Sequence, residues 1–191
     1  MTINIREATP ADARLIALIM AEAIQEGIMQ RAETSDLTQK DVKKITLLET
    51  VVLREDTLYS WRNTYIAETE NGRPAGGVIA YPGNGYNKAR AITFSLLHEI
   101  LTFNLETMDA ETVSGEYYLD SLAVLPSFRG NGIARELIQI VCQKAQQNGM
   151  PIALACEPEN IIAKTIYEEM GFQASHTIYI FGHNYIKMIR H

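Results

Sequence analysis

Apolar residues follow two different spacings along the chain, and these spacings predict a series of strands and helices. Short alternating or fully apolar runs predict strands over 3–6, 65–68, 77–81, 116–125 and 152–156, with two more flanking 182–184. Apolar positions three or four residues apart predict helices over 9–24, 38–52, 88–105, 132–148 and 160–171. This order of elements is typical of an α/β domain with a mixed sheet.

Local signals mark where several of these elements begin and end. Thr9 followed by Pro10 predicts a helix start, because Thr can cap free amides and Pro suits the first turn. Thr38 repeats the start signal, and Gly27 suits the end of a helix. Asn71-Gly72 lies between two strands and predicts a hairpin.

The turn between strand 116–125 and helix 132–148 carries the most information. Gly130 and Gly132 lack a Cβ atom, so the chain can turn sharply and an anion can approach the backbone. The first amides of a helix have no partner within the helix, and the helix dipole adds positive charge there. Arg129 contributes a permanent cation. The turn therefore predicts a site for a phosphate or diphosphate group.

Two familiar phosphate-binding motifs fit this turn poorly. A P-loop requires Lys and then Ser or Thr at the helix start, where this chain has Ile133 and Ala134. A dinucleotide-binding turn requires a third glycine where Arg135 stands, although Glu157 follows the next strand near the position of a ribose-binding acid. A nucleotide-dependent oxidoreductase is therefore kept as an alternative.

Two blocks of sequence resemble the GNAT superfamily of N-acetyltransferases. Residues 129–134 resemble its R/Q-x-x-G-x-G/A signature, with Ala134 in the last position, and residues 122–126 resemble its fourth strand. Residues 160–172 resemble its later motif, N-x-x-A-x-x-L/I-Y-x-x-x-G-F. The two motifs occur in the expected order and about one helix and one strand apart, and the resemblance is clear over 117–172.

The resemblance implies a fold and a co-substrate. The expected fold is α/β, with a mixed, mostly antiparallel sheet, helices on both faces and splayed central parallel strands, which is the acyl-CoA N-acyltransferase fold. We expect one domain over 1–191 with an inserted helix at about 86–106. Acetyl-CoA is the expected co-substrate, held in the opening between the two central strands.

The resemblance also implies which residues bind acetyl-CoA. Backbone amides over 129–134 would bind the diphosphate, and backbone groups of Leu122 and Val124 would pair with the pantetheine arm. Asn160 would lie near the pantetheine, although an asparagine at this position equally suits the N-cap of the helix. The expected cofactor-binding residues are Leu122, Ala123, Val124, Arg129, Gly130, Asn131, Gly132, Ile133, Ala134, Asn160, Ala163 and Tyr167.

Tyr167 lies where superfamily members often carry a tyrosine close to the CoA sulfur. The resemblance therefore implies that Tyr167 is the general acid, since a phenol with a pKa of about 10 can protonate a leaving thiolate. The alternative is a tyrosine packed into the core. Cys156 is a weaker candidate, as a nucleophile, because no histidine lies near it in sequence and small buried cysteines are common.

The resemblance places the general base two or four residues before Leu122, which indicates Asp120 and Tyr118. Because alternate residues of a strand share a face, we expect both side chains to point to the same side as Leu122 and Val124. A carboxylate with a pKa of about 3.9 is a weak base for an ammonium, so Asp120 would act through water or with a raised pKa. An equally favoured alternative is that Asp120 orients the substrate or is structural.

The acceptor is not defined by these motifs. In the superfamily the amine pocket is formed by segments that correspond here to about 27–60 and 83–115, where the resemblance is weak. Candidates to line the pocket are Tyr86, Phe94, His98 and Tyr118.

Composition narrows the class of protein further. The 191 residues carry a net charge of −6, which argues against broad nucleic-acid binding. The chain has no apolar run of membrane-spanning length, and its two cysteines and four histidines follow no metal-ligand spacing. We therefore expect a cytoplasmic enzyme without metal, nucleic-acid or membrane partners.

These observations lead to one functional hypothesis. It is an N-acetyltransferase that moves the acetyl group of acetyl-CoA to a primary amine of a small molecule or peptide, by direct attack in a ternary complex. A non-catalytic acyl-CoA-binding domain of the same fold is the main alternative. The sequence does not define the oligomeric state, and a homodimer stays open.

Overall fold

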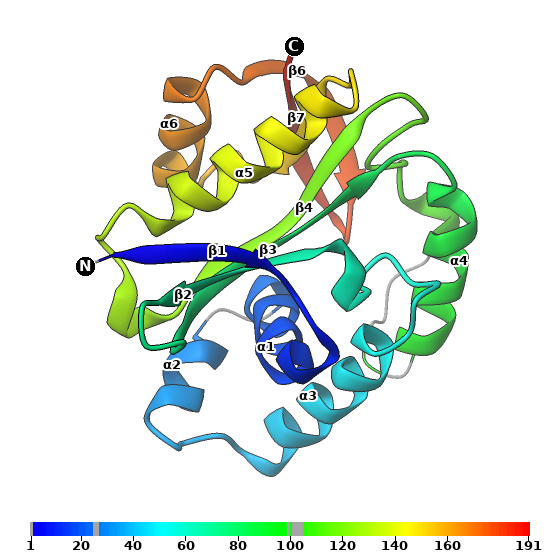
Figure 1. The fold of residues 1–191 in the computed structure, drawn as a ribbon. Helices are drawn as coiled ribbons and strands as arrows, with labels where there is room; N and C mark the ends of the chain where they lie inside the picture. Colours follow the sequence, from blue (N-terminus) through cyan, green and yellow to red (C-terminus); the bar gives the residue numbers. More distant parts are fainter. Residues whose placement is uncertain (1, 25–26, 99, 101–104) are drawn as a thin grey trace.

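The computed structural model describes residues 2–24, 27–98, 100 and 105–191, and it is built around one sheet (Figure 1). The seven strands have the order β1-β2-β3-β4-β5-β7-β6. Their bounds are β1 Ile3–Glu7, β2 Thr64–Thr69, β3 Pro74–Pro82, β4 Tyr117–Val124, β5 Ile152–Cys156, β6 Gln173–Ile180 and β7 His183–Arg190. Strands β4 and β5 are parallel, and the other neighbouring pairs are antiparallel. This confirms the mixed, mostly antiparallel sheet.

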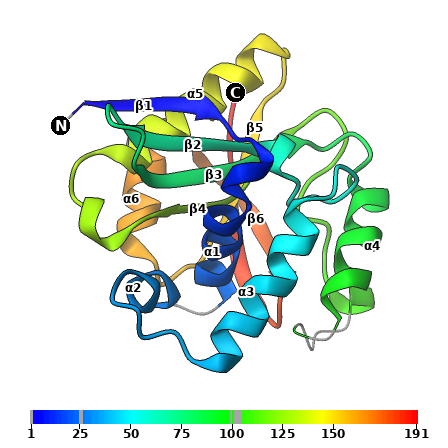
Figure 2. The ribbon, with the colours of Figure 1, turned by 60° about the horizontal axis from the view of Figure 1, so that its bottom comes forward.

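Helices cover both faces of the sheet, as expected (Figures 1 and 2). One face carries α1 (Ala13–Ile24), α2 (Ile28–Glu33), α3 (Gln39–Val52) and α4 (Tyr86–Leu97), and the other carries α5 (Ile133–Gln147) and α6 (Ile161–Glu169). Short 3-10 helices span Pro10–Asp12, Trp61–Asn63, Leu105–Thr107 and Pro126–Phe128. In the part of the chain that the structure describes, no helix has the length and apolar character to cross a membrane.

Each face of the sheet has its own apolar core. Ile16 and Ile19 of α1 are buried in one core, and Leu137 and Val141 of α5 are buried in the other. Burying each such side chain stabilises the fold by about 2 kcal/mol. The helical spacing of apolar residues therefore places α1 and α5 on opposite sides of the strands that they flank.

Several element boundaries agree with the local sequence signals. Thr38 caps α3 by accepting a hydrogen bond from the backbone N of Asp41 at 3.1 Å, and the Asp41 carboxylate accepts in return from Thr38 N. Gly27 has a left-handed backbone with φ of 84°, but it also begins a helix, α2, that the sequence did not predict. With only six residues, α2 is too short to give a clear apolar period.

Helix α4 is shorter than predicted. It begins at Tyr86 and ends at Leu97, whereas the apolar pattern predicted a helix over 88–105 within an insertion at 86–106. Part of that prediction, residues 99 and 101–104, lies outside the described residues.

A bulge in β4 corrects the predicted orientation of its side chains. Ile79 of β3 lies opposite Ser121, and the next residue, Ala80, lies opposite Leu119, so Asp120 is an extra residue in β4. An extra residue reverses the alternation of side chains beyond it. Tyr118 therefore packs in the core beneath α1 and α4.

Beyond the bulge, Leu122 and Val124 pack against the α5 core instead. The prediction that Tyr118 and Asp120 share a face with these two residues is wrong.

Between β3 and β4, residues 84–115 form a long excursion that leaves and rejoins the sheet at adjacent points. The backbone N of Gly83 donates to the carbonyl of Glu116 at 2.8 Å. The Asn84 side-chain oxygen accepts from the Ser114 hydroxyl at 2.7 Å. A Cβ atom on Gly83 would lie 2.0 Å from the carbonyl oxygen of Val113, so only glycine fits this close contact. Residues 84–115 therefore leave and rejoin the sheet at one place.

Candidate functional site

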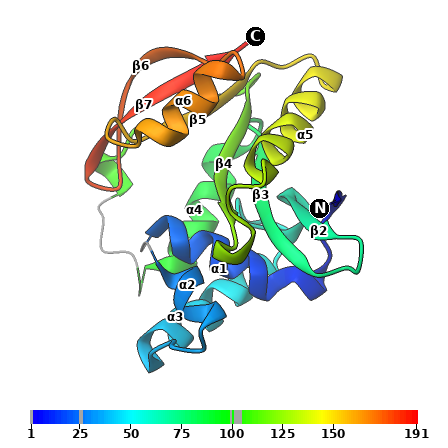
Figure 3. The same ribbon diagram turned by 90° about the vertical axis from the view of Figure 1, so that its left-hand side faces the viewer.

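The parallel strands β4 and β5 are paired only where they begin. Tyr117 lies opposite Ile152, and the register ends where Leu119 lies opposite Leu154. Strand β4 continues to Val124 beyond this pairing, whereas β7 pairs with the whole of β5 along its other edge. Figure 3 shows β5, β7 and β6 running away from β4, with α6 beside them. The second half of β4 thus has an open edge on this side.

A turn rich in glycine, residues 129–132, links β4 to α5 at this open edge. Gly130 and Gly132 have φ of 79° and 81°, a conformation that strains residues with a Cβ atom. No side chain caps α5, whose N-cap is Gly132, so its first amides are available to an anion. The Asn131 side chain holds the turn by donating to the carbonyls of Phe128 and Arg129 at 3.0 and 3.1 Å.

Arg129 and Ser127 connect this glycine turn to the helices on the opposite face. Nε of Arg129 donates to the carbonyl of Val124 at 3.1 Å, and its terminal nitrogen donates to Glu22 of α1 at 3.2 Å. The backbone N of Ser127 donates to Glu33 of α2 at 3.0 Å. Two carboxylates from α1 and α2 therefore fix the approach to the turn.

The other expected cofactor residues lie at the start of α5 and α6. Asn160 caps α6, since its side-chain oxygen accepts from the backbone N of Ala163 at 3.0 Å. Ala163 and Ala134 are partly buried against the α5 core, and Ile133 is fully buried in it. The side chain of Asn160 thus has a structural partner, and that of Ile133 belongs to the core.

Tyr167 lies on the inner side of α6, close to the end of β5. Its ring packs edge-on against Phe172, with 5.8 Å between centroids. Burial, with a smaller contribution from the charge of Cys156, raises the pKa of Tyr167 to about 12. Its hydroxyl therefore keeps its proton at neutral pH. Burial also raises the pKa of the Cys156 thiol, which makes it a poor nucleophile.

Asp120 occupies the bulge in β4 and has two hydroxyl partners. Tyr81 of β3 donates to one carboxylate oxygen at 2.5 Å, and Ser121 donates to the other at 2.8 Å. Burial raises the pKa of Asp120 above its ordinary value, although both hydrogen bonds oppose the shift. Burial thus gives Asp120 the raised proton affinity that a base would need.

A second carboxylate, Glu111, lies beside this group and was not predicted from the sequence. It is 4% exposed. Tyr86 of α4 donates to one of its oxygens at 3.2 Å, and Tyr118 of β4 donates to the other at 3.1 Å. Burial, and then the charge of Asp120, raise the pKa of Glu111 to about 8.

Aromatic stacking joins these side chains into one tyrosine–carboxylate cluster. The ring of Tyr81 lies 6.4 Å from that of Tyr86 and 5.9 Å from that of Tyr118. The cluster consists of Tyr81, Tyr86, Glu111, Tyr118 and Asp120. Glu111 was missed because nothing in the sequence around it resembles a motif, and only the fold brings it to β4.

Two of the four residues expected to line the acceptor site belong to this cluster, and two do not. Tyr86 and Tyr118 meet at Glu111. Phe94 packs against Phe181 at 6.0 Å between ring centroids. The exposed His98 contacts the Ser95 carbonyl of its own helix.

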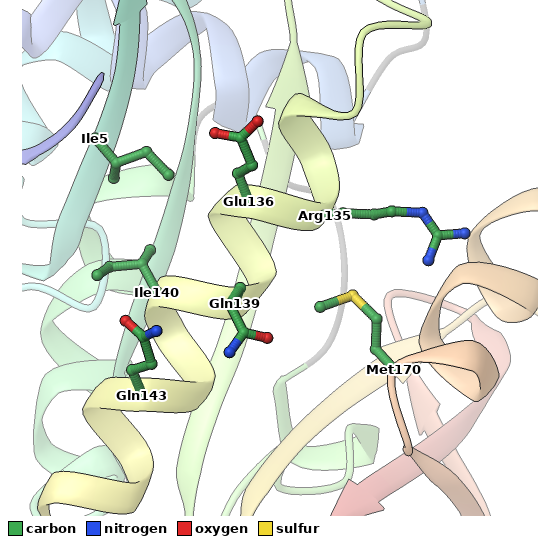
Figure 4. Close-up of a pocket in the computed structure, with 7 residues that line it drawn as sticks. All are labelled: Ile5, Arg135, Glu136, Gln139, Ile140, Gln143 and Met170. Carbon is green, nitrogen blue, oxygen red and sulfur yellow. The ribbon is translucent and has the colours of Figure 1, made fainter. Parts of the chain in front are cut away.

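A surface hollow on the outer side of α5 lies apart from both groups (Figure 4). Figure 4 shows Arg135 pointing from α5 toward α6, and Glu136 pointing away from Arg135. Arg135 forms an ion pair with Glu169 of α6. The hollow is lined by Ile5, Arg135, Glu136, Gln139, Ile140, Gln143 and Met170. It contains no residue of the glycine turn or of the cluster, and we assign it no role.

Both the sequence and the fold of this chain are similar to those of known acetyltransferases. A family model described as "Acetyltransferase (GNAT) family" matches residues 30–172. A crystal structure described as an acetyltransferase has a TM-score of 0.73 and 25% identity, over 98% of each chain. An N-acetyltransferase from Staphylococcus aureus Mu50 has a TM-score of 0.76 and 23% identity, over 97% of this chain and 99% of that one.

Two curated relatives match shorter stretches. N-alpha-acetyltransferase 30 of Saccharomyces cerevisiae is 43% identical over 56 residues, which cover 29% of this chain and 32% of the yeast protein. Aminoglycoside N(6')-acetyltransferase type 1 of Salmonella typhimurium is 32% identical over 62 residues, covering 32% of this chain and 43% of that protein. The matched stretch thus spans less than half the length of each relative.

Proposed function

Because the chain belongs to the acetyltransferase (GNAT) family, we propose that it transfers the acetyl group of acetyl-CoA to a primary amine in a ternary complex. The observation that carries this proposal is the combination of the glycine turn with the open edge of β4 beside it. Uncapped amides at the start of α5 suit a diphosphate. Leu122, Ala123 and Val124 lie on the part of β4 that has no partner on β5, where a pantetheine arm can bind the backbone.

In this proposal the side chains on either side of β4 divide the proton transfers. Asp120 takes one proton from the acceptor ammonium, and the freed nitrogen lone pair attacks the thioester carbon. The C–S bond breaks, and Tyr167 donates its proton to the departing thiolate. The nitrogen then loses a second proton, which restores the Tyr167 phenol. The proton on Asp120 passes to water, so the reaction releases one proton in total.

The acceptor is proposed as a primary amine of a small molecule or a peptide. One relative, named an N-alpha-acetyltransferase, supports a peptide acceptor. The other, named an aminoglycoside acetyltransferase, supports a small-molecule acceptor. The two carboxylates of the cluster, Glu111 and Asp120, favour an acceptor that arrives as a cation. The proposal holds for a monomer and for a homodimer alike.

Two measurements test the proposed function. Calorimetry with acetyl-CoA is expected to detect binding, and NAD is expected to give none, in keeping with the weak dinucleotide motif. A screen of amines for free-thiol release from acetyl-CoA is then expected to find an acceptor. Binding without turnover on any amine would support a non-catalytic acyl-CoA-binding domain instead, and no binding at all would remove the proposal.

A further inference from the structure

Glu111 is a buried carboxylate that the transfer reaction described above does not use. It comes from the excursion between β3 and β4, and it reaches β4 because the hydroxyls of Tyr86 and Tyr118 both donate to it. The same Tyr86 hydroxyl also accepts from the backbone N of Glu111 at 3.3 Å. These contacts hold the carboxylate in one position at 4% exposure. A buried acid with fixed partners and, among the residues that the structure describes, no cation bonded to it needs an explanation.

The position of Glu111 relative to Asp120 supplies one. Tyr81 donates a hydrogen bond to Asp120, and Tyr118 donates one to Glu111. The rings of these two tyrosines pack against each other, so the two carboxylates belong to one group of side chains. Two carboxylates in one desolvated cluster cannot both ionise freely, because each charge disfavours the other. The pair therefore holds its last proton more tightly than either acid would alone.

We infer that Glu111 is a positioning residue for acetyl transfer, whose charge beside Asp120 makes Asp120 a stronger base toward the acceptor ammonium. This inference rests on the proposed function. It assigns to the excursion of residues 84–115 a direct influence on the chemistry at β4.

The other charged and titratable groups around Glu111 are consistent with this role. Helix α4 contributes Arg90, whose charge lowers the pKa of Glu111 only as the last of its causes. Arg90 donates instead to the carbonyl of Met108 at 3.3 Å. Among the described residues, Glu111 also interacts electrostatically with the phenols of Tyr59, Tyr81 and Tyr185, which stay neutral because their pKa values are raised. Asp120 is therefore the carboxylate whose proton affinity Glu111 can tune.

The test is the dependence of kcat/KM on pH, measured by thiol release with the 191-residue chain. For the wild type, kcat/KM is expected to fall on the acid side of the profile as the Glu111–Asp120 pair takes up the proton that it loses last. This falling part of the profile is called the acid limb. Glu111→Gln keeps the shape but removes the charge, and its amide NH2 takes the place of one of the two oxygens that accept from Tyr86 and Tyr118. Its limb is expected to move to lower pH by about one unit or more, and kcat on the high-pH plateau is expected to fall.

Tyr86→Phe is the matched variant, with the opposite expected sign. It removes a hydrogen bond that lowers the pKa of Glu111, so the limb is expected to move to higher pH. A purely structural role would change stability without moving the limb in opposite directions. Repeating the wild-type profile with a second acceptor of different amine pKa identifies any limb that belongs to the substrate.

The outcomes separate this inference from the function on which it rests. An acid limb that stays in place in folded Glu111→Gln or Tyr86→Phe protein overturns the role of Glu111 while leaving the acetyltransferase intact. Folding of each variant is checked by its affinity for acetyl-CoA, which is expected to be unchanged. Should Glu111→Gln not fold, Tyr86→Phe alone still decides. Wild-type protein that releases no thiol with any amine overturns the function and the inference together.

Discussion

Tyr167 is a phenol that keeps its proton near neutral pH. Burial raises its pKa to about 12, so it can donate to a thiolate but does not ionise by itself near neutral pH. The residue has a packing partner in Phe172, which holds the ring in place without using the hydroxyl. The two roles considered for Tyr167, core packing and proton donation, are therefore compatible.

Replacing Tyr167 by Phe keeps the ring contact and removes the proton. We expect kcat to fall about 100-fold, because general acid catalysis contributes at least this much, with a much smaller change in acetyl-CoA affinity. Steady-state kinetics and calorimetry measure the two quantities. Tyr179→Phe is the control, since Tyr179 is an exposed phenol on β6, and its kcat is expected to match the wild type. A Tyr167→Phe enzyme with normal kcat would contradict the assignment.

At the scale of elements, helix α5 has a glycine with a left-handed backbone at each end. Gly132 precedes the helix with φ of 81°, and Gly149 follows it with φ of 65°. A Cβ atom on either would meet nothing within 4 Å, so the requirement for glycine comes from the backbone angle and not from space. The two positions differ in that only Gly132 borders the proposed diphosphate site.

Gly132→Ala and Gly149→Ala form a matched pair of variants. Each is expected to lower the free energy of unfolding by about 1 kcal/mol, because both force alanine into a left-handed conformation. Only Gly132→Ala is expected to weaken acetyl-CoA binding. Urea denaturation and calorimetry provide the measurements, and equal loss of affinity in both variants would argue against a diphosphate at this turn.

The capping role of Asn160 at the start of α6 can be tested independently of its proposed contact with the cofactor. Asn160→Ala removes the acceptor for the backbone N of Ala163 and is expected to cost about 1 kcal/mol of stability. Asn160→Ser restores a capping oxygen and is expected to recover most of that loss. Thermal unfolding of the two variants checks the expectation. Equal stabilities for Ala and Ser would show that the cap is unimportant.

For the whole molecule, one buried ion pair ties the second half of the sheet to the start of β4. Lys187 of β7 is 5% exposed, and its Nζ donates to Glu116 at 2.7 Å. Burial alone would raise the pKa of Glu116, but the hydrogen bond from Lys187 contributes to an overall lowering. The bridge lies near the place where β4 and β5 are still paired, before the strands separate.

Lys187→Met is expected to lower the free energy of unfolding at pH 7 by about 2 kcal/mol, because it leaves the Glu116 carboxylate without its cation. Because the folded-state pKa of Glu116 is lowered, the contribution is present above the unfolded pKa and disappears as the pH falls through the folded value. Urea denaturation at several pH values measures the effect. The double variant with Glu116→Gln is expected to recover part of the loss, and a difference that persists in strong acid would contradict the electrostatic explanation.

The sequence predicted those features that depend on neighbouring residues. The cap of α3 at Thr38 and the bounds of β5 follow from local composition, and both agree with the structure. The bulge at Asp120 could not be predicted, because it arises from the register between β3 and β4. The contact of Glu111 with Tyr118 could not be predicted either, since it depends on how a long excursion folds back.

The point where that excursion meets the sheet has a consequence for how proteins of this kind diversify. Gly83 and Glu116 are bonded to each other, so the intervening residues form a cassette whose two ends already meet. Evolution can lengthen, shorten or exchange such a cassette while the strands and the glycine turn keep their places. Because Tyr86 and Glu111 lie within it, under the proposed function a new cassette would bring a new set of groups to the acceptor amine. Under the proposed function, selectivity for the acceptor would therefore change separately from the strands and the glycine turn.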